Sequence, residues 1–512
     1  MAGSALDQQH LSLPRVFRAG ATGGRFLRLS HIQRRDASPP VKLPPTPLET
    51  QRFQAYSSSA DVAAYLAQLA ALAPKVARLQ TLGRSAQGRP LQALICAQPL
   101  RTAKLRVMLV GSQHGASEAA GCEALLFLAR DVLLGERREL LEDLELIFIP
   151  NANPDGRDLD SSKNGNDVNL NRDYVLLTQP ESCALDAAVI DFAPDVILDA
   201  HESASYKSKT LGREGYLTDF EAQFDVANTP AIPAVNRRYL ESTLLPALIA
   251  GVTQRGLRAQ RYIREITSLT QPLTHGGFTI RKFRNKAGIR GPLTILLETP
   301  MEPKAGHYPT YRNIGVRVDK QRLCLQVFLA CVSERAVQIR EVLKLAAGEV
   351  PSELPLNARF VPNVNMPELS IPLRRHATGE LVERQFADHR ACVIEDLVVL
   401  PPAYVINAHV NLFGAVLARH GIKFETISRA ERRSVQTRVF PKGISPEEAA
   451  SPWQPWAGKV VLDPGTLRIP LAQPSRRIIP LLLDPRAASS VFRYRPFGRL
   501  LEGPLFIYDE VE

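Results

Sequence analysis

Two histidines and a glutamate have the residue types and the spacing of a metal site. His114 and Glu118 lie four residues apart in Gly-Ser-Gln-His-Gly-Ala-Ser-Glu, and His201 follows in Leu-Asp-Ala-His-Glu-Ser. Imidazole and carboxylate are typical ligands of a catalytic zinc ion, which keeps its fourth position for water. The bound water then becomes a nucleophile at neutral pH. We therefore expect one zinc ion per chain on these three side chains.

A helix is expected to follow the first two ligands. Residues 119–134 form a nearly continuous apolar run, and Ser117 is placed to cap a helix that starts at Glu118. If that helix extends back to His114, a spacing of four puts both ligands on one face. Glu202, next to His201, is the rival carboxylate ligand, although a supporting role suits it better.

The candidate residues follow strand-like segments. Short apolar runs alternate with helical patterns along the first two thirds of the chain, as at 104–110, 144–149, 195–198 and 294–297. This alternation predicts an α/β fold, a mostly parallel sheet with helices on both faces. Sites in such sheets lie beyond the carboxyl ends of the strands. The side chains that follow strands in this way are those of His114, Asn171, His201 and Glu298.

Length and composition predict more than one domain. The chain has 512 residues, of which 45% are hydrophobic, enough for two or three cores. We expect a basic, proline-containing extension over residues 1–50 and a catalytic domain over 51–347. The composition changes near residue 350, so residues 350–512 are expected to form a smaller β-rich or α+β domain.

The net charge of +11 is compatible with an acidic polymer, a membrane surface or an anionic substrate. Aromatic residues make up only 6% and do not accompany the basic ones, so nucleic acid is not an expected partner. No apolar run approaches the roughly 18 residues that cross a bilayer. The first residues lack the apolar core of an export signal, and the six scattered cysteines are expected to be free thiols. The compartment, whether cytoplasmic by default or periplasmic or secreted, stays open, as does the oligomeric state.

Several ordered motifs resemble the zinc carboxypeptidase family, the carboxypeptidase A-like metallopeptidases. The resemblance covers roughly residues 55–345. Besides the ligands, it rests on Gly83-Arg-Ser-Ala-Gln-Gly-Arg-Pro, Asn153-Pro-Asp-Gly, Asn169-Leu-Asn-Arg and Leu297-Glu-Thr-Pro. It implies a sheet of eight mixed strands between helices, with zinc on His114, Glu118 and His201.

The resemblance also implies roles for other residues. Asn171 and Arg172 match the pair that holds a terminal carboxylate, which suits a planar guanidinium. Glu298 matches the general base that takes a proton from the zinc-bound water. A cation that stabilises the oxyanion has three candidates, which are Lys163, Arg157 and Arg284.

Three positions depart from the family pattern. The family usually spaces its first two ligands as His-x-x-Glu, whereas this chain has one more residue. Asn169 stands where the family often has an aspartate that orients the first histidine. Lys286 stands where an aromatic residue is expected at the mouth of the substrate site.

The leading hypothesis is a zinc metallocarboxypeptidase that hydrolyses the last amide bond of a peptide or peptide-like substrate. A second hypothesis is a zinc amidohydrolase that deacylates small N-acyl amino acids, as in succinylglutamate desuccinylase-like proteins. A third hypothesis is a binding protein without activity. The extra residue between the first two ligands favours it, as does Asn169, whereas Glu298 argues against it.

Overall fold

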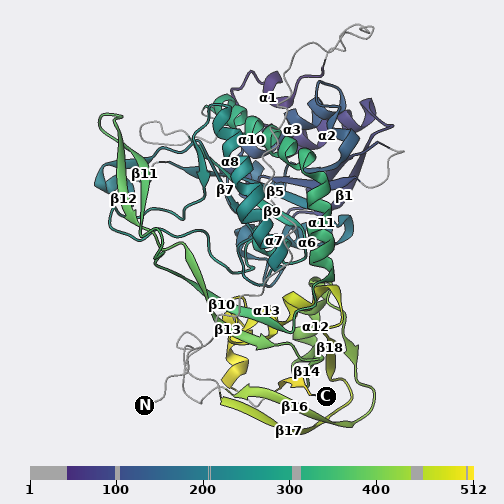
Figure 1. Ribbon diagram of the computed structural model, residues 1–512. Coiled ribbons are helices and arrows are strands. Elements are labelled where there is room, and N and C mark those ends of the chain that lie inside the picture. Colours follow the sequence, from purple (N-terminus) through teal and green to yellow (C-terminus); the bar gives the residue numbers. More distant parts are fainter. Residues whose placement is uncertain are drawn as a thin grey trace. The chain divides into compact units, whose positions relative to one another are not determined.

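An eight-stranded sheet forms the middle layer of the part of the chain before residue 350 (Figure 1). The structure is a computed structural model that describes residues 43–98, 104–205, 207, 209–301, 313–439, 454–502 and 506–511. The strand order is β1-β2-β4-β3-β5-β9-β7-β8. The strands are β1 (Ala77–Arg84), β2 (Pro90–Cys96), β3 (Leu105–Gly111), β4 (Leu144–Ile149), β5 (Val196–Ala204), β7 (Ala222–Val226), β8 (Ala259–Arg261) and β9 (Leu293–Met301).

The sheet is mixed and its middle is parallel. Strands β4, β3, β5 and β9 run parallel to one another, whereas β1 with β2, β2 with β4 and β7 with β9 are antiparallel pairs. The predicted α/β fold with a mixed, mostly parallel sheet is therefore confirmed. The parallel strands bring their carboxyl ends to one edge of the sheet, where sites form in folds of this kind.

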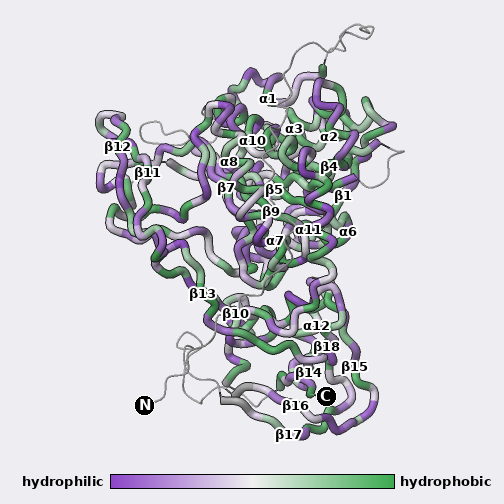
Figure 2. Tube along the Cα trace, in the orientation of Figure 1, coloured by the Kyte–Doolittle hydropathy of each residue, from purple (hydrophilic) through white to green (hydrophobic). Residues whose placement is uncertain are grey.

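Helices cover both faces of the sheet. Along β3, Leu105, Val107 and Leu109 pack into one core cluster, whereas Met108 and Val110 pack into a second. This alternation follows from the two-residue period of a strand. Helices α2 (Ser59–Leu72), α3 (Ala120–Leu133), α8 (Leu245–Gln254) and α10 (Ile314–Glu334) contribute to the first cluster, and α6 (Pro180–Phe192) and α9 (Phe283–Gly288) to the second. Figure 2 shows hydrophobic stretches along these central strands.

The architecture changes near residue 350, as the composition predicts. Helix α11 (Ala336–Gly348) ends there, and the strands that follow form antiparallel sheets. One pairs β10 (Glu353–Val361) with β13 (Ala391–Val399), and another has the order β15-β18-β14-β19-β16-β17. The members of the latter are β14 (Ala403–Ile406), β15 (Glu425–Thr426), β16 (Glu431–Val439), β17 (Gln454–Leu462), β18 (Leu467–Pro470) and β19 (Ile507–Glu510). With helices α12 (Val410–Arg419) and α13 (Ile478–Leu483), this confirms a β-rich or α+β C-terminal part.

A hairpin of the C-terminal part also extends a strand of the first part. Strand β11 (Glu368–Arg375) pairs with β12 (Leu381–Ala387) on one side and with β6 (Tyr216–Thr218) on the other. The range Leu43–Glu512 forms one compact unit, so the boundary near 350 remains a prediction about separate domains. None of the described helices is both long and apolar enough to cross a membrane.

The packed body begins before the boundary at residue 51 that we expected. Thr46 caps the short helix α1 (Pro47–Thr50) in a reciprocal pair with Glu49, and Leu48 is fully buried. Most of the expected basic extension, residues 1–42, lies outside the described part of the chain.

Candidate metal centre

The three predicted ligands meet at the carboxyl edge of the sheet. His114 Nδ1 lies 2.5 Å from Glu118 Oε1, and His201 Nδ1 lies 2.7 Å from Glu118 Oε2. One ligand atom from each residue falls within 4.8 Å of the other two. Two imidazoles and one carboxylate in this arrangement fit a zinc ion and leave one position for water.

A tight turn after β3 carries the first two ligands. Residues Gly115–Glu118 form a 3-10 helix, and α3 begins only at Ala120, so the expected helix start at Glu118 with Ser117 as its cap is wrong. Gly115 has a φ of 53°, and a Cβ there would lie 2.4 Å from the backbone of Gly156. Close packing against Asn153-Pro-Asp-Gly therefore requires glycine and sets the turn, which still brings Glu118 to His114.

Strands β5 and β9 deliver the remaining groups on a common face. Residues 196, 198 and 200 of β5 and residues 293, 295 and 297 of β9 pack into the first core cluster. The two-residue period places His201 and Glu298 on the opposite face, the one covered by α9. His201 and Glu298 are also partners in the register of the two strands. Glu298 therefore lies beside the ligand cluster.

Asp199 supports the second histidine, a role that our sequence analysis missed. Its Oδ2 lies 2.9 Å from His201 Nε2, while Gln113 Nε2 donates to its Oδ1 at 2.7 Å. A carboxylate on the far nitrogen of a ligating histidine fixes its ring and raises its basicity. The available signal was the Asp-x-His spacing within a strand, which puts both side chains on one face.

Glu202 is not a member of the cluster. Both of its carboxylate oxygens bind the guanidinium of Arg317 on α10, at 2.7 Å each, and the N–H of Ala120 donates to Oε2 at 2.9 Å. Through these contacts, Glu202 links β5 to α3 and α10. Glu118 is thus the carboxylate of the candidate zinc site, despite the extra residue in the spacing.

Negative charge dominates this centre. Burial alone would raise the pKa of Glu118, but the neighbouring His114 and His201 lower it. Although burial again opposes the shift, Asp199 and Glu118 raise the pKa of His201 well above its usual value. With Glu298 also beside it, His201 has three carboxylates near its ring. Such a centre favours a bound cation.

Glu298 has the properties of a proton acceptor. Its Oε2 atom is buried and has no hydrogen-bond partner among the described residues. Burial raises the pKa of Glu298 to about 7, with His201 acting in the opposite direction. A carboxylate with a pKa near neutrality and a free oxygen can take up and release a proton at neutral pH.

The three candidate oxyanion cations are each paired with a carboxylate. Lys163 Nζ lies 2.8 Å from Asp167 on a side chain that is 45% exposed. Arg157 is buried against Glu123, and its Nε donates to Ser57 O at 2.6 Å. Arg284 Nη1 lies 2.6 Å from Asp225 Oδ2, while its buried Nε has no partner among the described residues.

The predicted carboxylate-binding pair lies against α9. Asn171 Oδ1 accepts the N–H of Phe283 at 2.9 Å, and Arg172 Nη1 donates to Asn171 O at 2.7 Å. The neighbouring Lys282 is a cation that the sequence did not single out. Burial and the charges of Arg284 and Arg172 lower the pKa of Lys282 to about 8.

Two departures from the family pattern have structural outcomes. His114 Nε2 and Asn169 Oδ1 are both buried without a hydrogen-bond partner among the described residues, so the expected bond between them is absent. Lys286 is not at the mouth of the site, because its side chain is fully buried and contacts His420 Nδ1 and, at 3.4 Å, Asp186.

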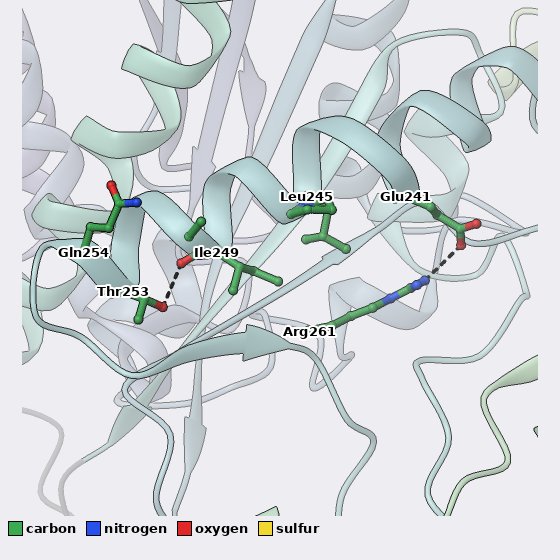
Figure 3. Close-up of a pocket in the computed structure, with 8 residues that line it drawn as sticks. Glu241, Leu245, Ile249, Thr253, Gln254 and Arg261 are labelled. Atoms are coloured by element: carbon green, nitrogen blue, oxygen red, sulfur yellow. Dashed lines mark hydrogen bonds and ion pairs between the residues drawn. The ribbon is translucent and has the colours of Figure 1, made fainter. Parts of the chain in front are cut away.

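Two hollows lie outside the ligand cluster. A cavity of about 70 Å³ continues past the end of β5, with Ser203, Gln223 and Tyr262 in its wall. A shallow groove of about 600 Å³ runs along the outer side of α8, where Glu241 and Arg261 form an ion pair at 3.0 Å (Figure 3). No zinc-site residue lines the groove, whereas Gln223 of the smaller cavity pairs with Glu298 across β7 and β9.

Comparison with known families agrees with this geometry. The family model for zinc carboxypeptidase matches residues 62–185, which contain His114, Glu118, Asn171 and Arg172. This part of the chain is therefore similar to the zinc carboxypeptidases. The resemblance drawn from the ordered motifs is thereby confirmed, and with it the assignment of His114, Glu118 and His201 as a zinc site typical of the family.

Proteins named as carboxypeptidases match part of the chain. Carboxypeptidase 2 of Trichophyton rubrum is 26% identical over 201 residues, 38% of this chain and 37% of that protein. Carboxypeptidase SOL1 of Arabidopsis thaliana is 30% identical over 159 residues, 28% of this chain and 32% of that protein. A solved metallo-carboxypeptidase from Burkholderia cenocepacia is 19% identical with a TM-score of 0.43, and the match covers 55% of this chain and 71% of that one. The chain thus spans less than half the length of these two sequence relatives.

Proposed function

We propose that the protein is a zinc metallocarboxypeptidase that hydrolyses the C-terminal amide bond of a peptide or peptide-like substrate. One observation carries the proposal. The free, buried oxygen of Glu298 lies beside three convergent ligands, at the register partner of His201. A binding protein without activity has no need of a proton acceptor at this point.

Each of the site residues has a separate role in the proposed hydrolysis. A zinc ion held by His114, Glu118 and His201 supplies Lewis acidity and lowers the pKa of water. Glu298 accepts a proton from the water while the oxygen atom of the water forms a bond to the scissile carbonyl carbon. The C–N bond then breaks, and Glu298 returns the proton to the leaving amine nitrogen. Asp199 keeps the ring of His201 oriented throughout.

Arg172 and Asn171 are proposed to hold the substrate's terminal carboxylate. Arg172 has no ion-pair partner among the described residues, and its guanidinium offers two parallel N–H donors. The oxygen of the Asn171 side chain is already occupied by Phe283 N, so its contact with a carboxylate would come from Nδ2.

Arg284 is the favoured cation for the oxyanion. Its side chain is buried, and Nε is a donor without a described partner, although Asp225 already neutralises part of its charge. Lys163 is the second choice, because its ammonium is engaged by Asp167 in an exposed pair. Such a cation contributes several kcal/mol to the transition state in related chemistry.

A comparison of free and amidated substrates tests the proposal. Peptides that differ only in a C-terminal carboxylate or carboxamide should differ in kcat/KM by roughly 10² or more, because a charged contact is lost. Arg172→Ala should lower kcat/KM for the free peptide by a similar factor and should have little effect on the amide. Arg138→Ala is the matched control, since Arg138 is exposed and precedes the amino end of β4 at the opposite edge of the sheet.

Two results would contradict the assignment. Equal cleavage of free and amidated peptides would indicate an endopeptidase or a general amidase. Hydrolysis of small N-acyl amino acids without any cleavage of peptides would instead indicate the amidohydrolase activity considered in the sequence analysis.

A further inference from the structure

We infer that the site selects a substrate whose last residue has an acidic side chain, and that Arg281 binds this second negative charge beside Arg172. The inference rests on the proposed function and names the substrate class of the same site. It would make aspartate or glutamate the preferred C-terminal residue.

The segment that carries Arg281 is fixed at both ends. Ile280 N donates to Ser489 Oγ at 3.0 Å, and Phe283 N donates to Asn171 Oδ1 at 2.9 Å. Both bonds are buried. Arg281 and Lys282, which lie between them, are therefore held close to Asn171, the residue before Arg172. Arg281 is the more exposed of the pair, whereas Lys282 is half-buried.

Other cations around the site are neutralised by nearby acids. Arg284 pairs with Asp225 at 2.6 Å. The buried Lys286 lies 3.4 Å from Asp186, and the buried Arg157 contacts Glu123. An internal ion pair neutralises part of each charge, so these cations attract a second substrate anion less strongly than unpaired cations do.

Three cations of the site differ from this pattern. Within the described ranges, Arg172, Arg281 and Lys282 form no ion pair with a carboxylate. The three charges are close enough to influence one another, since Arg281 acts on both Arg172 and Lys282. Glu118 and Glu298 offset part of this charge, but neither forms an ion pair with the three cations, so their mutual repulsion favours a bound anion.

The number of charges points to a substrate end with two anions. In the proposed function, Arg172 takes the terminal carboxylate. Arg281 is then left with no described acid to bind, and Lys282, closer to Glu298, adds to the positive field. A glutamate or aspartate side chain at the substrate terminus supplies the missing negative charge a few bonds from the first carboxylate.

The test compares two peptides that end in Glu and in Gln and are otherwise identical. With the intact metalloprotein, kcat/KM for the Glu peptide should exceed that for the Gln peptide by about tenfold, the usual size of one charged hydrogen bond. Arg281→Gln should abolish this ratio by lowering kcat/KM for the Glu peptide. Arg281→Lys should restore part of the ratio, because the charge is kept. Arg138→Gln, at the far edge of the sheet, should leave the ratio intact.

A binding measurement separates this inference from the proposed function. Metal-loaded Glu298→Gln protein is titrated with both peptides by calorimetry, and the Glu peptide should bind about tenfold more tightly. Equal cleavage of both peptides by the unmodified protein would overturn the inference while the proposed function stands. If the unmodified protein cleaves neither peptide but the Glu peptide still binds more tightly, the proposed function is overturned and the inference about Arg281 stands. Retention of the full ratio in Arg281→Gln would also overturn the role of Arg281.

Discussion

At the residue scale, hydrogen-bond partners decide what each carboxylate near His201 can do. Asp199 contacts the ring of His201 and accepts from Gln113, so its charge is committed to orienting a ligand. Glu202 is committed in the same way to Arg317. Glu298 has a buried oxygen with no hydrogen-bond partner and no ion pair among the described residues, so it is the carboxylate left to exchange a proton with water and substrate.

Glu298→Gln should keep the metal and lose most of the activity. The amide preserves the shape of the side chain but cannot accept a proton, so kcat should fall by roughly 10² to 10⁴. Metal content and thermal unfolding should match those of the unmodified protein. Glu145→Gln, near the amino end of β4, is a matched control. Nearly normal turnover in Glu298→Gln would remove this residue from the mechanism.

His114→Ala and His201→Ala should each lose zinc. Removal of one of three protein ligands leaves too few donors to hold the ion tightly, which metal analysis of the purified variants will measure. His389→Ala serves as the control, since His389 lies in the C-terminal part and outside the cluster. Stoichiometric zinc in both ligand variants would show that the ion binds elsewhere.

The sequence predicts the ligands better than it predicts the cations. Residue type and spacing identify His114, Glu118 and His201, because metal chemistry restricts the choice to a few side chains. The partner of a basic residue depends on tertiary contacts between distant segments. The pairing of Arg284 with Asp225, 59 residues away, therefore leaves no local signal, and Lys282 escaped notice for the same reason.

At the element scale, two adjacent parallel strands and one helix build the centre. Strands β5 and β9 present His201 and Glu298 on one face, and α10 supplies Arg317 to the strand position next to His201. Gln321 of the same helix donates to His201 O at 2.8 Å. Helix α10 therefore fixes the strand end from which the third ligand projects.

Arg317→Met should destabilise the fold and weaken metal binding together. It leaves Glu202 as a buried, unpaired charge, a change that typically costs about 3–5 kcal/mol. The double change Arg317→Met with Glu202→Met should be less destabilising than the single one, because no isolated charge remains. Chemical denaturation of the four proteins measures this cycle. Additive effects would mean that the two side chains do not interact in solution.

Apolar runs identify the central strands, but the turn between β3 and α3 was predicted incorrectly. A buried parallel strand needs a continuous apolar segment, so the pattern is strong in β3, β4, β5 and β9. The 3-10 turn at Gly115–Glu118 depends instead on contact with Gly156, far along the chain. Propensity and capping residues carry no information about such a contact.

At the scale of the whole molecule, a buried polar network joins the C-terminal part to helices α6 and α9 of the first part. His420, at the end of α12, has Nε2 2.8 Å from Val175 O and Nδ1 in contact with Lys286. Asp186 balances Lys286 and Arg290, and Arg290 also donates to His420 O at 2.9 Å. Burial and the charge of Lys286 lower the pKa of His420 well below its usual value.

The fold should lose stability below pH 6.5 through His420. In the unfolded chain this histidine binds a proton near pH 6.5, whereas in the folded protein it stays neutral until its lower pKa is reached. The unfolding free energy should therefore fall by up to about 1.4 kcal/mol for each pH unit below 6.5. Lys286 acts in a different pH range. Burial lowers the pKa of Lys286 to about 7, so its effect on the unfolding free energy lies above pH 7.

Denaturation curves of the unmodified protein and of His420→Gln at pH 7 and pH 5.5 will measure this effect. The unmodified protein should lose about 1 kcal/mol more than the variant between the two values. His389→Gln is the control and should behave like the unmodified protein. Equal losses in the protein and in His420→Gln would assign the pH dependence to other groups.

The bond between Ile280 and Ser489 also sets an order of events during translation. His114, Glu118, His201 and Glu298 leave the ribosome well before Ser489 is added. Until then, the segment that carries Arg281 lacks one of its two anchors. A nascent chain can therefore bring its metal ligands together before Ser489 is made, whereas the segment that carries Arg281 gains its second anchor only afterwards.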